Sequence, residues 1–168
     1  MPYTDLLRLA VLLSGAQATA LGAIAVAGAD GADDPRILIG AFAWWLIALA
    51  IGAYLGRPSR AADGVREALT RARTSTALPP ETPSRIALAR LWPIGLSAVA
   101  AGALGAFFPV VAAVGAGYAL LVSLAWHSRE AAVLAVEQRD GVRFYVVPNS
   151  ALRPVQLVRT PGLRSERL

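Results

Sequence analysis

Cysteine and lysine are both absent from this sequence, and histidine occurs once. Without cysteine the chain forms no disulfide, no iron–sulfur cluster and no thiolate zinc site. All sixteen basic residues are therefore arginines, whose planar guanidinium binds phosphate through two parallel hydrogen bonds, as an ammonium cannot. A GC-rich genome is the simpler explanation of the bias, because it also favours alanine, glycine and proline.

Charge of either sign is scarce, at 16% of residues, while 56% are hydrophobic. Soluble domains average about 25% charged and 45–50% apolar residues. Crossing about 30 Å of hydrocarbon takes roughly 20 apolar residues in a helix. We therefore predict an all-α membrane domain over residues 1–126, with a loop at 57–87 and spans near 6–28, 37–55, 88–107 and 109–126.

The last two spans come from a single uncharged stretch that runs from Leu91 to Trp126. That stretch is too long for one crossing and just long enough for two short ones. Phe107-Phe108-Pro109 lies in its middle, and proline cannot donate the helical hydrogen bond. We predict a tight hairpin there; the alternative is one long, kinked helix.

Arginine is distributed unevenly between the connecting segments. The segment 29–36 carries three aspartates and one arginine, whereas the loop 57–87 with Arg90, and the tail after residue 126, carry seven arginines each. Arginine accumulates in cytoplasmic loops of membrane proteins. We predict a bacterial inner-membrane protein with both termini in the cytoplasm, and an acidic, solvated turn on the outside.

Two cytoplasmic elements are expected. Residues 59–74 have the spacing of a basic amphipathic helix, which would lie on anionic lipid headgroups or serve only as a solvated connector. The tail, 127–168, is predicted to be β-rich, because VLAVEQ and VRFYVV flank Asp140-Gly141, a hairpin signal. A third strand is expected at 154–159. So small a sheet must dock on the loop helix, the membrane, a second copy or another protein.

Few side chains point to chemistry. Gln17, deep in the first span, and Tyr118 are candidates for an interhelical hydrogen bond or a narrow polar path. His127, at the mouth of the fourth span, is expected to anchor the interface, since a lone imidazole makes a poor metal site. We predict no catalytic residue, metal or cofactor. The candidate contacts to headgroups or a partner are Arg60, Arg66, Arg71, Arg73, Arg129 and Arg143.

Three functions are compatible with these features. We favour a non-catalytic subunit or scaffold whose basic loop and tail dock a partner or anionic lipid. The second is a small homo-oligomeric channel or solute transporter, formed through the Gly- and Ala-rich third and fourth helices or the C-terminal sheet. The third is a membrane-embedded enzyme acting on lipid. Membrane lipids are expected partners in every case, and nucleic acid in none.

Overall fold

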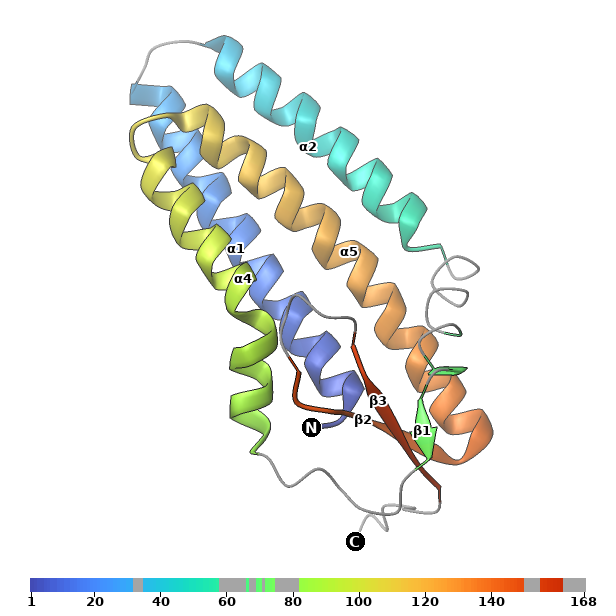
Figure 1. Ribbon diagram of the computed structural model, residues 1–168. Coiled ribbons are helices and arrows are strands. Elements are labelled where there is room, and N and C mark those ends of the chain that lie inside the picture. Colours follow the sequence, from blue (N-terminus) through green and yellow to red (C-terminus); the bar gives the residue numbers. More distant parts are fainter. Residues whose placement is uncertain are drawn as a thin grey trace, which may run out of the picture.

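The computed structural model describes residues 1–31, 35–57, 66, 69–70, 72–74, 82–149 and 155–161. Long helices and a small sheet make up this part of the chain (Figure 1). The elements are α1 (Tyr3–Gly31), α2 (Pro35–Leu55), β1 (Arg73–Thr74), α4 (Pro83–Gly105), α5 (Pro109–Asp140), β2 (Val142–Val146) and β3 (Leu157–Pro161). Four helices of the described chain, α1, α2, α4 and α5, are each long and apolar enough to cross a membrane. This is the architecture of a multi-pass membrane protein.

The hairpin predicted between the last two spans is confirmed. Helix α4 ends at Gly105 and α5 begins at Pro109. The turn closes through the Phe108 amide, which donates to the Leu104 carbonyl at 2.8 Å. Proline at the first helical position removes only an amide that would lack a helical acceptor anyway, so α5 starts there without penalty.

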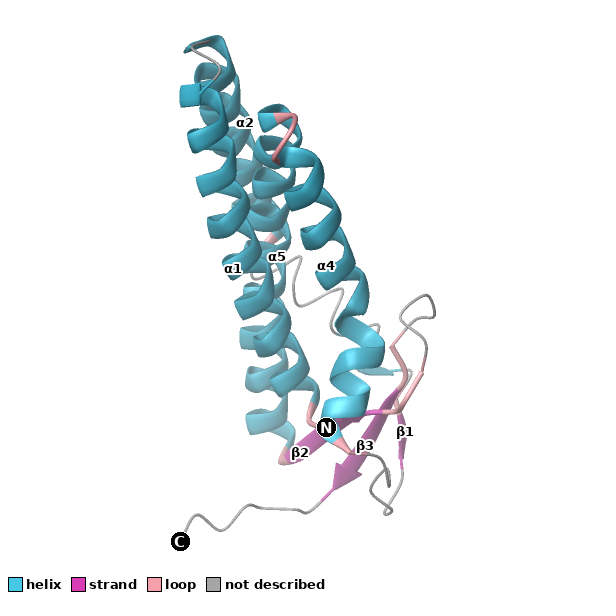
Figure 2. Cartoon of the chain, turned by 90° about the vertical axis from the view of Figure 1, so that its left-hand side faces the viewer, coloured by secondary structure: helices cyan, strands magenta, loops and turns pink. Residues whose placement is uncertain are grey.

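Helices α1 and α5 form the centre of the bundle, with α4 packed on both and α2 packed mainly on α5 (Figures 1 and 2). Small side chains line the central contact and let the two backbones approach closely. The buried small residues are Ala10, Ser14, Ala18, Ala25 and Ala29 on α1, and Ala112, Ala113, Ala116, Gly117 and Ala119 on α5.

Two tryptophans attach α2 to α5. The Trp45 indole N–H donates to the Ala113 carbonyl at 2.9 Å, and the Trp44 indole N–H donates to the Val114 carbonyl at 3.2 Å. Gly117 gives the Trp44 ring its space, because a Cβ at that position would collide with the indole nitrogen. Interhelical hydrogen bonds of this kind contribute about 0.6 kcal/mol on average in membranes.

At one end of the bundle, which we call the sheet end, the strands lie in the order β1-β3-β2. Strand β3 pairs antiparallel with β2, with Phe144 opposite Arg159, and parallel with β1. The N-terminus joins the outer side of β2: the Val146 amide donates to the Met1 carbonyl at 3.0 Å. The first residues of the chain and its last described strands therefore share one structure (Figure 2).

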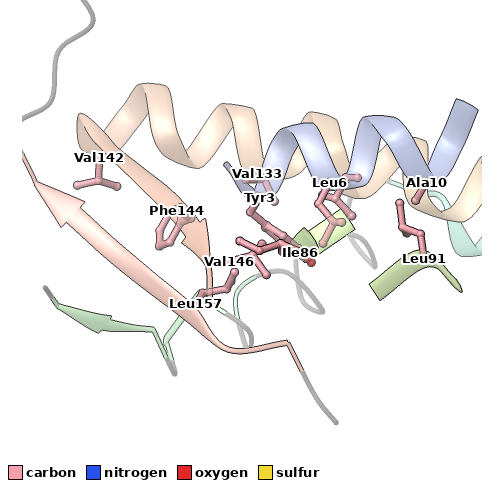
Figure 3. Close-up of a cluster of buried hydrophobic side chains, with 11 residues drawn as sticks. Tyr3, Leu6, Ala10, Ile86, Leu91, Val133, Val142, Phe144, Val146 and Leu157 are labelled. Atoms are coloured by element: carbon pink, nitrogen blue, oxygen red, sulfur yellow. The ribbon is translucent and has the colours of Figure 1, made fainter. Parts of the chain in front are cut away.

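A hydrophobic core joins the sheet to the ends of three helices. Tyr3, Ile86 and Val146 meet in its middle, from α1, α4 and β2 (Figure 3). Its buried members are Tyr3, Leu6, Leu7, Ala10, Ile86, Leu91, Val133, Val142, Phe144, Val146 and Leu157. The small sheet thus docks on the ends of the chain's own helices, a surface that was not among those expected from the sequence.

The predicted hairpin at Asp140-Gly141 is wrong. Residues 131–140 continue α5 as helix, and Gly141 ends that helix in the left-handed region, at φ 62° and ψ 30°. Its amide donates to the Glu137 carbonyl. A two-residue hairpin and a helix C-cap both need positive φ, so Asp-Gly is compatible with either. The span predicted to end at residue 126 therefore belongs to a helix that runs on without a break.

The helix predicted over 59–74 is wrong at its C-terminal end. Arg73 and Thr74 form β1, where Arg73 pairs with Val158. Of the remaining residues, Arg66, Leu69 and Thr70 are helical, and the other positions up to residue 71 lie outside the described part of the chain. Pairing with β3 supplies backbone hydrogen bonds that helical periodicity in the sequence does not reveal.

Candidate functional site

A groove of about 670 Å³ runs along the part of α5 that continues beyond the predicted span. This volume is within the range of known ligand sites, about 300–1,000 Å³. The residues that line it come from α2's end, the 66–70 segment, α5 and the sheet. They are Gly56, Arg66, Leu69, Thr70, His127, Ser128, Ala131, Ala132, Ala135, Val136, Arg139, Asp140, Phe144 and Arg159.

The floor of the groove is one face of α5. Residues three or four apart in a helix lie on the same face. The floor residues have this spacing, so their side chains lie together: Ala131, Ala132, Ala135 and Val136. They are small and apolar, and each is exposed or only half-buried. The floor is therefore shallow and offers apolar contact without polar groups that need partners.

Cations surround this floor. Arg66 lies on the wall formed by the loop segment, Arg139 on α5 and Arg159 on β3. The Arg139 guanidinium contacts the Asp140 carboxylate at 2.8 Å, and its hydrogen bond holds the pKa of Asp140 below the usual value. Among the lining residues that the structure describes, three arginines against one aspartate leave a charge of +2 before His127 is counted.

Glu137 fixes the joint between α5 and the sheet beside the groove. Its carboxylate oxygen accepts a hydrogen bond from the Phe144 amide at 3.0 Å. Burial raises the pKa of Glu137, while the Phe144 amide and the charge of Arg143 act in the opposite direction. This contact holds β2 against the last turn of α5, and so positions the end of the groove.

Of the residues proposed from the sequence, Arg66 and His127 meet in the groove. Arg129 is exposed on α5 and acts electrostatically on Tyr3, at the α1 side, whereas Arg143 is exposed on β2 and its carbonyl accepts from Thr160 at 3.2 Å. The six predicted arginines therefore do not form one cluster among the described residues. Arg60 and Arg71 lie outside those residues, and Arg73 is described only as part of β1.

Gln17 and Tyr118, the two polar candidates predicted within the spans, do not lie together. The Gln17 amide donates to Ser97 Oγ at 3.4 Å, which links α1 to α4. Ser97 in turn donates to the Ile94 carbonyl at 2.8 Å. Tyr118 is 64% exposed on the surface of α5. Gln17 thus takes part in an interhelical hydrogen bond, which is one of the two roles predicted for it from the sequence.

Sequence reasoning missed half of the groove. Arg139 and Asp140 were assigned to a turn and Arg159 to a strand, and two of the floor residues, Ala135 and Val136, were also assigned to a strand. The signal that would have found them is composition: apart from two valines, residues 131–139 are all Ala, Leu, Glu, Gln or Arg, which a helix accepts readily.

A second cavity, of about 800 Å³, lies among α1, α2 and α5 within the apolar bundle. Its described lining is mostly small and apolar, with Asp30 as the charged member. Among the residues that the structure describes, no three His, Cys, Asp or Glu side chains gather as metal ligands. Comparisons with protein-family models, with curated proteins and with solved structures give no match.

Proposed function

We propose that this protein is a non-catalytic subunit or scaffold of the bacterial inner membrane, which docks an acidic partner or anionic lipid through the groove beside α5. The observation that carries the proposal is the combination of an apolar floor on α5 with three arginines around it, which are Arg66, Arg139 and Arg159. An apolar floor gives affinity through burial, and the guanidinium groups select for carboxylate or phosphate.

The sheet end is the cytoplasmic end in this proposal. Fourteen of the sixteen arginines belong to the loop after α2, the start of α4 or the tail. The N-terminus, the start of α4 and the end of α5 meet at the sheet end (Figures 1 and 2). Arginine is retained on the cytoplasmic side during insertion, which supports this orientation.

The chemistry of the groove supports binding over catalysis. Its charged groups are mainly guanidinium groups, whose pKa is too high for them to accept a proton near neutral pH. Asp140, the acid among the described residues that line the groove, is held by Arg139 at 2.8 Å. Such groups orient and retain an anion, and they do so without exchanging protons with it.

Single charge reversals test the proposal. Arg66→Glu and Arg159→Glu each change the charge of a groove wall by two units, and Arg85→Glu makes the same change on an exposed residue of α4 outside the groove. Each protein is purified gently from its own membrane, and its bound proteins and lipids are quantified by mass spectrometry. We expect both groove variants to lose the same species and Arg85→Glu to retain it. Retention of every species by all three variants refutes the proposal.

Deleting the tail would not be a clean test. Val133, Phe144 and Leu157 belong to the same core as Tyr3 and Ile86, so removal of residues 130–168 exposes that core. Loss of a partner from such a variant would follow from misfolding alone. The charge reversals avoid this problem because Arg66, Arg159 and Arg85 are all exposed.

A further inference from the structure

We infer that the occupant of the groove is an acidic, amphipathic segment of another protein, which lies along the last three turns of α5. The inference rests on the proposed function and chooses between its two ligand classes. It follows from how far the groove reaches beyond the lipid, from the nature of its floor and from the placement of its charges.

The membrane boundary can be located on α5 from its contact with the end of α2. Gly56 directly follows α2, and a Cβ at that position would lie 2.6 Å from the Ser128 hydroxyl, so the two residues are at the same level. Arg57 stacks over the Tyr54 ring at 5.0 Å, an arrangement typical of a residue leaving the apolar layer. The hydrocarbon therefore ends close to His127 on α5.

The groove continues well past that boundary. Arg139 lies twelve residues beyond His127, which is about 18 Å along a helix. The headgroup layer is only about 5–8 Å thick on each side of a bilayer. With α5 perpendicular to the bilayer, Arg139 is therefore about 10 Å beyond the reach of a phospholipid phosphate, and a headgroup would fill only the first third of the groove.

The shape and charge of the groove match a peptide. About 18 Å of helix corresponds to a segment of about 12 residues, and the alanine floor lets such a segment approach α5 closely. Arg66 and Arg159 stand on different walls, so carboxylates along both edges of the segment would find partners. Arginine binds carboxylate through two parallel hydrogen bonds, which favours glutamate and aspartate at those edges.

Photocrosslinking in the full chain tests the occupant directly. p-Benzoylphenylalanine replaces Ala135 on the floor of the groove and, in a matched control, Ala89, an exposed alanine of α4 outside the groove. Both proteins are irradiated in their own membranes, and the adducts are identified by mass spectrometry. We expect a protein adduct at residue 135 alone, through a segment rich in Asp and Glu. We also expect Arg159→Glu to reduce its yield about tenfold.

The other outcomes separate the two proposals. A phospholipid adduct at residue 135 overturns the peptide inference and leaves the docking function standing. An adduct with a second copy of this chain, or with a segment without acidic residues, also overturns the inference. If residue 135 gives no more adduct than residue 89, and Arg66→Glu retains all bound species, both the inference and the docking function are wrong.

Discussion

The contact between Gly117 and Trp44 provides a test of how α2 is held on the bundle. Replacing Gly117 with alanine places a methyl group where the Trp44 indole nitrogen now lies. The indole must then move, and its hydrogen bond to the Val114 carbonyl is lost with it. We expect α2 to separate partly from α5, while α1, α4 and the sheet keep their packing.

The size of the effect follows from three contributions. Overpacking of a tight contact costs about 1–3 kcal/mol. Loss of the Trp44 hydrogen bond adds about 0.6 kcal/mol. Alanine stabilises the helix by about 1 kcal/mol relative to glycine, which offsets part of this cost. We therefore expect Gly117→Ala to lower the free energy of unfolding by about 0.6–2.6 kcal/mol.

The assay is thermal stability in a mild detergent. Samples are heated and run on size-exclusion chromatography, and the temperature at which half of the protein has left the monodisperse peak is recorded. Gly95→Ala is the control, because no atom lies within 4 Å of a Cβ built at Gly95; it should be neutral or stabilising. In a Trp44→Leu background, Gly117→Ala should cost almost nothing. If its cost is the same with tryptophan or leucine at position 44, collision with the indole is not the cause, and the reasoning fails.

Two further predictions concern the sheet end. Because burial raises the pKa of Glu137 above its usual 4.5, the folded protein binds this proton more tightly than the unfolded chain, and stability falls as pH rises from about 4.5. Glu137→Gln should weaken that fall in a series of melting temperatures, whereas Glu137→Ala should cost about 1–3 kcal/mol by leaving the Phe144 amide without its acceptor. Val133→Ala should lower stability by about 2 kcal/mol, since Val133 is fully buried, and should exceed the loss in Leu134→Ala, which removes a side chain 40% exposed. Equal losses in the last pair would contradict the assignment of the core.

Hydropathy was sufficient to predict the membrane helices, because a span is recognised from the length of its own apolar run without knowledge of its neighbours. The break at Pro109 was also visible in the sequence, although proline alone does not decide it, since Pro93 lies inside α4 without ending that helix. At Asp140-Gly141, by contrast, the local sequence does not decide between a hairpin turn and the end of a helix. The positive φ of Gly141 suits both structures, and packing of Val133 against α1 and the sheet favours the helix.

The groove could not be assembled from the sequence for a related reason. Arg159 comes near Arg66 only because β3 pairs with β1, and that pairing joins the tail to the loop between the second and third spans. Two-residue strands such as Arg73–Thr74 leave no periodic signal. His127 was predicted to lie at the membrane interface, but the walls opposite it depend on long-range contacts that one sequence does not reveal.

The pairing of Met1 and Pro2 with β2 has a consequence for biogenesis. The Met1 carbonyl accepts from the Val146 amide, and Pro2 bridges to Tyr145, so residues that precede α1 pair with residues that follow α5. Contacts so distant in sequence form slowly, after the helices have been inserted. A first helix inserted in the opposite orientation would hold Tyr3 on the wrong side of the bilayer from Val146, and the core at the sheet end could not close. The core of this small sheet can therefore close only when the ends of α1, α4 and α5 that it joins lie on the same side of the membrane.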